Sequence, residues 1–335
     1  MNHHVAMRNL TMVKDIHPYT YKLLALSFLE GIGRFKLFSL IKNAIDFSKP
    51  IEELSLILTK KANFDIELII KKANEQIDLS KKFDGTILSP FDEEYPDYLK
   101  DLDDSPILLF CRGNIELLNT NNIAIIGTRA PTLHGEILNR KLTKWFSNHN
   151  WTIVSGLALG HDSIAHEECL KNNGKTVAVL AHGLDSVYPK SNTALANSIL
   201  ENKGLLISEY PYLTPLFKSS LVQRDRIQAA LSKAVILVQS STGGGSLYAS
   251  NSILKYKRYL IVVNQSKSDI KNNETNISAN MNIINNNQQE IIKMFGKNFS
   301  SDLILLLNQS KDFIEIQNKL LEYSPKHTSY TLDLL

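Results

Sequence analysis

The feature that most constrains the fold is an alternation of short apolar runs and helical segments between residues 122 and 264. Runs of this length, rich in Ile, Val and Leu, are typical of buried strands. Strands that alternate with helices build a doubly wound, mostly parallel sheet through right-handed crossovers. The predicted strands are 123–126, 152–154, 176–180, 205–208, 234–238 and 259–263, and the predicted helices are 135–148, 163–172, 193–202, 224–231 and 246–256.

Two of these predicted strands end in turns that contain glycine. Ligands of open α/β sheets bind at the carboxyl ends of the strands. Glycine permits a close backbone approach there, and the N-terminus of the next helix presents N–H groups to an anion. An arginine in the first turn adds a fixed positive charge on a planar group. The sequence therefore predicts a ligand that carries phosphate. The turns contain Gly127, Thr128, Arg129, Ser155, Gly156 and Gly160.

Composition narrows the class of protein. The formal net charge is +3 over 335 residues, so a nucleic-acid site has to be a local patch and not a global field. Cys111 and Cys169 are too few for a disulfide framework and favour a reducing compartment. No apolar run approaches the roughly 20 residues that span a bilayer, and residues 1–15 lack the apolar core of a signal peptide. We therefore expect a cytoplasmic protein that makes no membrane contact.

The chain divides into three predicted parts. Residues 1–82 form a small helical domain, 83–295 the α/β core, and 296–335 a short helical tail. The core opens with a proline-punctuated lead-in of one or two strands at 83–122, and its Asn-rich stretch at 266–290 is expected to be loop-rich. The turn Gly31–Gly33 in the helical domain has two interpretations. It is either a helix-hairpin-helix (SAM-like) turn that holds a DNA phosphate, or the bend of a simple helical bundle.

Several kinds of catalytic site find little support. His166 and Cys169 share a helical face near His161, but no fourth metal ligand is evident, so we expect these side chains to pack in the core. The glycine turn at 243–245 lacks the lysine of a P-loop, and Ser155 lacks the Gly-x-Ser-x-Gly elbow of hydrolases. The sequence therefore predicts a protein without enzymatic activity, cofactor or metal.

Six motifs follow one another along the chain at strand ends and helix starts. They are GTR at 127–129 with His134 and Gly135, SGLALG at 155–160 with Asp162 and His166, AVL at 178–180 with Gly183, Asp185, Tyr188 and Pro189, SEYP at 208–211, RDRI at 224–227, and GGGSL at 243–247. In this order they resemble the DNA-processing protein A (DprA/Smf) family over roughly residues 85–265.

The resemblance implies a Rossmann-like protein of natural transformation that binds single-stranded DNA. Such proteins form homodimers, protect incoming strands and help to load the RecA recombinase. Single-strand binding needs a positive groove for the phosphates and platforms for the bases. Besides the turn residues above, the predicted DNA or phosphate contacts are Lys175, Arg224, Arg226, Gly244, Gly245 and Ser246, with Arg129 as the principal anchor.

This chain departs from the family pattern at several positions. Leu221 stands where the family commonly has phenylalanine, so the aromatic is lost unless Phe217 substitutes for it. Asp225 stands between the two arginines where the family has asparagine. Gln239 replaces a usual glutamate, and Asn264-Gln265 replaces a closing Pro-Gly. An aspartate at 225 is expected to pair with an arginine and to lower the positive potential of the site.

The alternative interpretation is a nucleotide-ligand sensor or a phosphoribohydrolase-like enzyme of the same Rossmann-like superfamily. Those enzymes carry a glutamate four residues after the last glycine of their glycine-rich turn, and here that position is Ala249. A third alternative is a scaffold that bridges RecA to another component.

Overall fold

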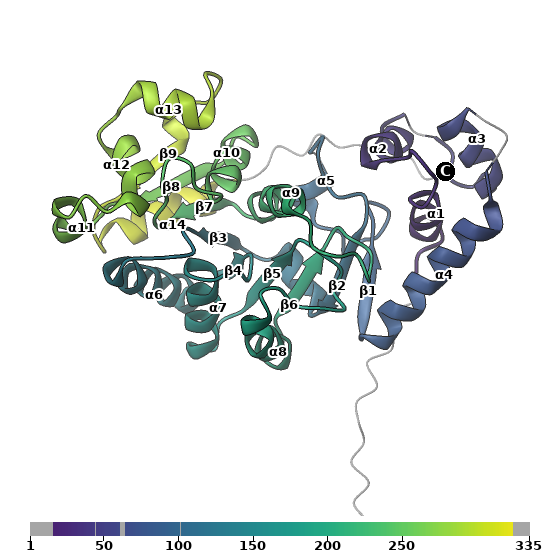
Figure 1. The fold of residues 1–335 in the computed structure, drawn as a ribbon, viewed down its shortest axis with the longest axis horizontal. Helices are drawn as coiled ribbons and strands as arrows, with labels where there is room; N and C mark the ends of the chain where they lie inside the picture. Colours follow the sequence, from purple (N-terminus) through teal and green to yellow (C-terminus); the bar gives the residue numbers. More distant parts are fainter. Residues whose placement is uncertain (1–15, 44, 61–63, 101, 324–335) are drawn as a thin grey trace, which may run out of the picture.

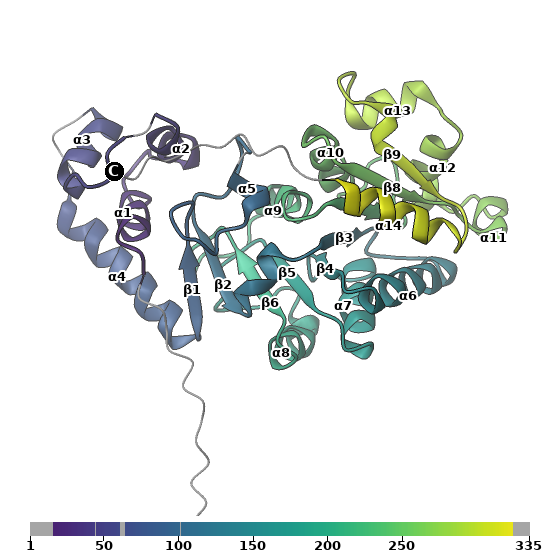
Figure 2. The same cartoon turned by 180° about the vertical axis from the view of Figure 1, so that it is seen from behind.

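A computed structural model describes residues 16–43, 45–60, 64–100 and 102–323. A nine-stranded sheet runs through the molecule, and four N-terminal helices lie beside its β1 edge (Figure 1). Seen from behind, α6 (Leu133–Asn148) and α14 (Asp312–Glu322) lie on the half of the sheet that is away from the N-terminal helices (Figure 2).

The N-terminal helices begin at recognisable caps. Pro18 opens α1 next to the ring of His17, which accepts the Tyr19 N–H, and Asp65 accepts the Leu68 N–H at the start of α4. Gly31 has a φ of +71°, a conformation that favours glycine, in the bend between α1 and α2. The bend therefore needs its glycine, and a phosphate-binding role of this turn stays a prediction. The helices are α1 (Pro18–Leu26), α2 (Arg34–Lys42), α3 (Ile51–Thr59) and α4 (Ile66–Lys82).

The sheet has the order β1-β2-β6-β5-β4-β3-β7-β8-β9. Its seven strands from β6 to β9 are parallel, whereas β2 pairs antiparallel with both β1 and β6. This arrangement confirms the predicted doubly wound, mostly parallel fold. The strands are β1 (Gly85–Leu88), β2 (Leu109–Gly113), β3 (Asn122–Ile126), β4 (Thr152–Ser155), β5 (Thr176–Leu180), β6 (Leu205–Ser208), β7 (Ala234–Leu237), β8 (Tyr259–Val263) and β9 (Ile304–Leu307).

Helices bury apolar side chains on both faces of the sheet. Ile227 of α9 and Ile253 of α10 pack on one face, and Leu142 of α6 and Ile316 of α14 pack on the other. The helices of this part are α5 (Asp97–Lys100), α6 (Leu133–Asn148), α7 (His161–Lys171), α8 (Thr193–Glu201), α9 (Lys218–Ala230), α10 (Leu247–Lys255), α11 (Lys267–Lys271), α12 (Ser278–Ile284), α13 (Gln288–Phe295) and α14 (Asp312–Glu322).

The prediction of an all-helical tail from residue 296 was wrong at 304–307. These residues form β9, which pairs parallel with β8. Their side chains alternate between the two faces of the sheet, because Ile304 packs on one face while Leu305 and Leu307 pack on the other. In a run of four apolar residues the sequence does not show whether the hydrophobic period is that of a helix or that of a strand. The sheet therefore continues beyond the predicted end of the core.

The Asn-rich stretch at 266–290 is also more regular than predicted. It contains α11, α12 and the first turn of α13. Asn280 is fully buried, and its amide donates to the carbonyls of Leu237, Val238 and Val263 while its oxygen accepts the Ser240 N–H. Composition marks asparagine as a loop residue, but here the amide satisfies carbonyls at the ends of two strands.

Candidate nucleic-acid interface

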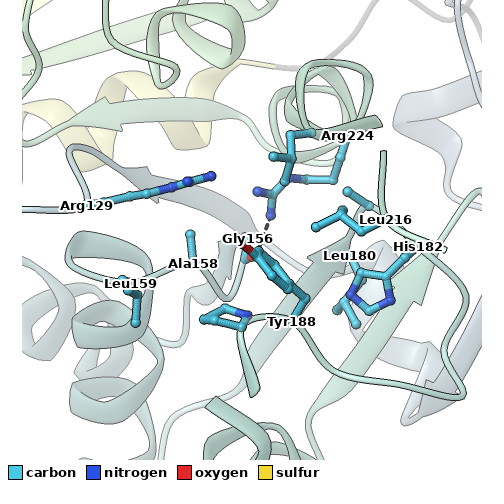
Figure 3. A pocket seen from close by; sticks show the side chains of 12 residues that line it. Arg129, Gly156, Ala158, Leu159, Leu180, His182, Tyr188, Leu216 and Arg224 are labelled. Carbon is cyan, nitrogen blue, oxygen red and sulfur yellow. Dashed lines mark hydrogen bonds between the residues drawn. The ribbon is translucent and has the colours of Figure 1, made fainter. Parts of the chain in front are cut away.

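A small pocket lies at the carboxyl ends of β4 and β5, between the turns that follow them and the N-terminal half of α9 (Figure 3). Its volume of about 50 Å³ gives room for a few waters, each needing roughly 10–15 Å³, or for one phosphate-sized group. The pocket sits where the sheet topology predicts a ligand. It is lined by Arg129, Gly156, Ala158, Leu159, Leu180, Ala181, His182, Tyr188, Pro189, Leu216, Leu221 and Arg224.

Arg129 is the exposed cation of this pocket. It follows β3, and Figure 3 shows its guanidinium extending over the pocket toward Arg224. The backbone that carries it is held on both sides, because the Thr128 N–H donates to the Gln239 carbonyl (2.8 Å) and the Thr128 carbonyl accepts the His161 N–H (3.2 Å). Among the residues that the structure describes, no hydrogen bond or ion pair engages the Arg129 guanidinium. The guanidinium is therefore exposed at the pocket on a backbone that is held in place, and its contact with an anion stays a prediction.

Each glycine of the two turns is closely packed on the side where a Cβ would stand. A Cβ on Gly127 would lie 2.3 Å from the His161 ring, and one on Gly160, whose φ is +75°, would lie 2.5 Å from the Thr128 carbonyl oxygen. A Cβ on Gly156 would overlap the Arg224 guanidinium. A side chain therefore does not fit at any of the three positions, Gly156 lines the pocket, and a ligand contact by the backbone of these glycines stays a prediction.

Arg224 is a buried framework cation. Its side chain is 5 % exposed, and Nη1 donates to the carbonyls of Gly156 and Val179, at 2.7 Å for the latter. The Asp162 carboxylate accepts the Gly156 N–H at 3.1 Å from the other side of the same peptide segment. Arg224 thus ties the turn after β4 to β5, and only part of its charge reaches the pocket that it lines.

Arg226 does not reach the pocket, contrary to the prediction. Two residues further along α9, it points away and makes a bidentate ion pair with Glu209 at 3.0 and 2.6 Å. Its Nε donates to the Asp104 carbonyl at 3.0 Å, and its side chain is 7 % exposed. These bonds occupy the guanidinium, so Arg226 holds the fold together and is not available to a phosphate in this conformation.

Two further predicted DNA contacts, Lys175 and Ser155, do not face the pocket with their side chains. Lys175 precedes β5, which places it at the amino edge, across the strand from Leu180 and the pocket, where its Nζ donates to the Asn202 carbonyl. Ser155 is buried and donates to the Ile125 carbonyl at 2.7 Å. The structure therefore does not bring Lys175 to the pocket, and it keeps the Ser155 hydroxyl inside the fold.

The glycine turn after β7 lies at the carboxyl edge but is not part of the pocket lining. Gly244 and Gly245 lie in a turn closed by the Gly244 N–H and the Ser241 carbonyl, and Ser246 donates to the Ser240 hydroxyl at 2.8 Å. A phosphate contact by these residues stays a prediction.

Sequence reasoning missed most of the pocket rim. The pocket residues Tyr188 and Leu159 are 50 % and 47 % exposed. Phe217, the candidate substitute for the family's aromatic, follows the pocket residue Leu216 and is 54 % exposed. Lys218 is an exposed cation at the start of α9, between the pocket residues Leu216 and Leu221. The sequence gives no sign of these exposures, although Lys218 beside an aromatic is a pattern that single-strand binding sites use.

The buried histidines have the properties of core residues. Burial lowers the pKa of His161 to about 4 and that of His166 to about 3, so both are neutral near pH 7. His161 Nδ1 lies 3.0 Å from the Asn139 amide nitrogen, and His166 Nδ1 lies 2.7 Å from the Thr176 hydroxyl. Within the described ranges, no three His, Cys, Asp or Glu side chains are grouped to hold a metal ion.

The fold and the site together define a Rossmann-like α/β protein with an arginine-lined pocket at the carboxyl edge of its sheet. The family model for DNA recombination-mediator protein A matches residues 86–296. The chain therefore belongs to this family, the DNA-processing proteins DprA and Smf.

Relatives and solved structures agree with this membership. The chain is 37 % identical over 178 residues to the DNA processing protein DprA of Bacillus subtilis, covering 53 % of this chain and 60 % of the relative. The X-ray structure of DprA from Streptococcus pneumoniae superposes with a TM-score of 0.69 at 25 % identity, over 90 % of this chain and 98 % of that one.

A second solved structure concerns DNA binding directly. It is described as showing the single-stranded DNA binding mode of DNA processing protein A from Helicobacter pylori. It has a TM-score of 0.56 and 29 % identity, over 71 % of this chain and 97 % of that one. The chain spans about half the length of the curated relatives it matches, 60 %, 46 % and 44 % for three of them. None of the helices in the described part of the chain is both long and apolar enough to cross a membrane.

Proposed function

We propose that this protein binds single-stranded DNA at the carboxyl-edge pocket, as a DNA-processing protein of the DprA/Smf type. The observation that carries the proposal is the exposed Arg129 guanidinium over a phosphate-sized pocket. Arg129 would contact a backbone phosphate or stack on a base, and Lys218 would contact the next phosphate.

The apolar rim supports single-stranded over duplex DNA as the ligand. Bases stack on exposed aromatic side chains only when they are free of a partner strand, and each stacked base contributes ~1–3 kcal/mol. Tyr188, which lines the pocket with Arg129, and Phe217, the neighbour of Lys218 in the chain, would supply two such rings. The solved structure of the Helicobacter pylori relative, which is described as giving insights into its single-stranded DNA binding mode, supports the same class of ligand.

Further parts of the proposal follow from the family. We propose that the protein acts by binding DNA without a chemical step, in the cytoplasm, as a homodimer that protects incoming strands and assists RecA loading during natural transformation. The position of the glutamate in phosphoribohydrolase-like enzymes is the fully buried Ala249, which disfavours that alternative. A nucleotide-ligand sensor would use the same pocket and is separated from our proposal by the titration below.

The proposal is tested by fluorescence anisotropy of a labelled oligo-dT titrated with the protein at two salt concentrations. Two phosphate contacts give a slope of about −1.4 in log K against log salt, so affinity should fall about sevenfold between about 50 and 200 mM. An unlabelled oligo-dT should compete better than a duplex of the same length. Absence of binding at the lower salt, with a mononucleotide bound instead, would contradict the proposal and favour the sensor.

Lys218→Ala tests the second contact. Loss of one phosphate contact should flatten the salt slope by about 0.7 and weaken binding several-fold at the lower salt. Lys218 is exposed at the start of α9, so its removal should leave thermal stability unchanged. An unchanged slope in the anisotropy titration would place the second phosphate elsewhere.

A further inference from the structure

We propose that Asp225 tunes the affinity of the pocket: its carboxylate neutralises the arginines there and so weakens anion binding in the ionised state. This inference rests on the proposed function, since it concerns how strongly that same site holds a phosphate. Asp225 stands where the resemblance to the family implies an uncharged asparagine, so the tuning is a property of this chain.

The Asp225 carboxylate contacts Arg224, one of the residues that line the pocket. Its Oδ1 lies 3.0 Å from Arg224 Nε and accepts a hydrogen bond from the Gln228 amide at 2.9 Å. The side chain is 14 % exposed, so solvent screens its charge only partly. Arg224 in turn lines the pocket, so the carboxylate is in contact with a cation of the surface that a phosphate would meet.

The charges that face Asp225 come from three elements. Arg224 lies on α9 itself, Asp162 in the first turn of α7, and Arg129 in the turn between β3 and α6. With all four groups ionised, two positive and two negative charges cancel. An uncharged residue at 225 would leave the site with a net charge of +1, which favours an incoming phosphate.

The same geometry makes the tuning depend on pH. Burial above all, and also the charge of Asp162, raise the pKa of Asp225 to about 6, against the lowering effect of Arg224 and Arg129. The carboxylate is therefore ionised near pH 8 and protonated near pH 5, so anion binding should strengthen as the pH falls through about 6. His182 also lies near Arg224, and burial lowers its pKa, so its protonation would act at the acid end of this range.

The test compares wild-type protein with Asp225→Asn in oligo-dT titrations at about pH 8 and pH 5. At pH 8 the variant should bind roughly three- to tenfold more tightly, the effect of removing one unit charge near a partly solvated phosphate. As the pH falls, the affinity of the variant should rise less than that of the wild type, since only Asp162, whose pKa burial also raises, and His182 still titrate there, and the two affinities should converge at pH 5. Asp103→Asn is the matched control, because it makes the same change in net charge at an exposed surface position and should behave as the wild type.

The outcomes separate this inference from the proposed function. If the wild type and the variant bind DNA equally at pH 8, or if the variant keeps the full pH dependence, the tuning role is wrong while DNA binding stands. If neither binds DNA at either pH, the proposed function fails. Asp225→Ser is a second uncharged variant, and the two variants should agree if charge and not hydrogen bonding to Gln228 sets the affinity.

Discussion

Arg129→Ala should weaken binding of single-stranded DNA by about 10- to 100-fold. The guanidinium is exposed over the pocket, and its removal takes away a charge-assisted phosphate contact or a stacked base, each worth ~1–3 kcal/mol. A factor of ten corresponds to about 1.4 kcal/mol. The measurement is the anisotropy titration of labelled oligo-dT at low salt. Because Arg129 is exposed, the thermal midpoint of the variant should match that of the wild type.

Lys175→Ala is the matched control for this substitution. It removes the same charge from the amino edge of the sheet, across β5 from the pocket. Its effect on affinity should stay within about twofold, as expected for a distant, screened charge. Equal losses from both variants would mean that the protein attracts DNA through its overall field and that the pocket is not the site.

Arg226→Ala should lower the free energy of unfolding by about 3–5 kcal/mol, which is the usual cost of leaving one partner of a buried ion pair unpaired. The partner is Glu209, whose side chain is 11 % exposed and makes two hydrogen bonds with Arg226. In the variant Arg34, at 3.9 Å, is the remaining nearby cation and compensates only in part. Urea unfolding measures the change.

Arg140→Ala provides the comparison for Arg226→Ala. Arg140 pairs with Glu167 and Glu168 at the surface, at 3.4 and 3.5 Å with its own side chain 42 % exposed, so its loss should cost no more than about 1 kcal/mol. Equal costs for the two variants would mean that the Arg226–Glu209 pair is not a structural tie. The predicted role also requires Arg226→Ala to bind DNA normally at temperatures where it stays folded.

The parallel sheet could be predicted because its signal is local. Each central strand is a short apolar run, and a helix of suitable length follows it before the next run. The position of the pocket followed from topology alone, since the carboxyl ends of parallel strands meet at one edge. Position at a strand end could also have excluded Lys175, because a residue that precedes a strand lies at the opposite edge.

The roles of the two α9 arginines could not be predicted, because sequence gives charge but not burial. Arg224 and Arg226 are two residues apart on a helix and therefore point in different directions. Arg224 donates to carbonyls of the turn after β4 and of β5, whereas Arg226 pairs with Glu209 after β6. These partners come from distant parts of the sequence, so only the folded chain reveals that both guanidinium groups are already engaged.

The most direct test of the central claim is to map where single-stranded DNA touches the protein. An oligo-dT that carries a photoreactive thymidine analogue would be cross-linked to the full chain and the modified peptides identified by mass spectrometry. We predict cross-links at Tyr188 and in the segment 216–221 on the rim of the pocket, and their loss in Arg129→Ala. Cross-links confined to the N-terminal helices α1–α4 or to the amino edge around Lys175 would contradict the account.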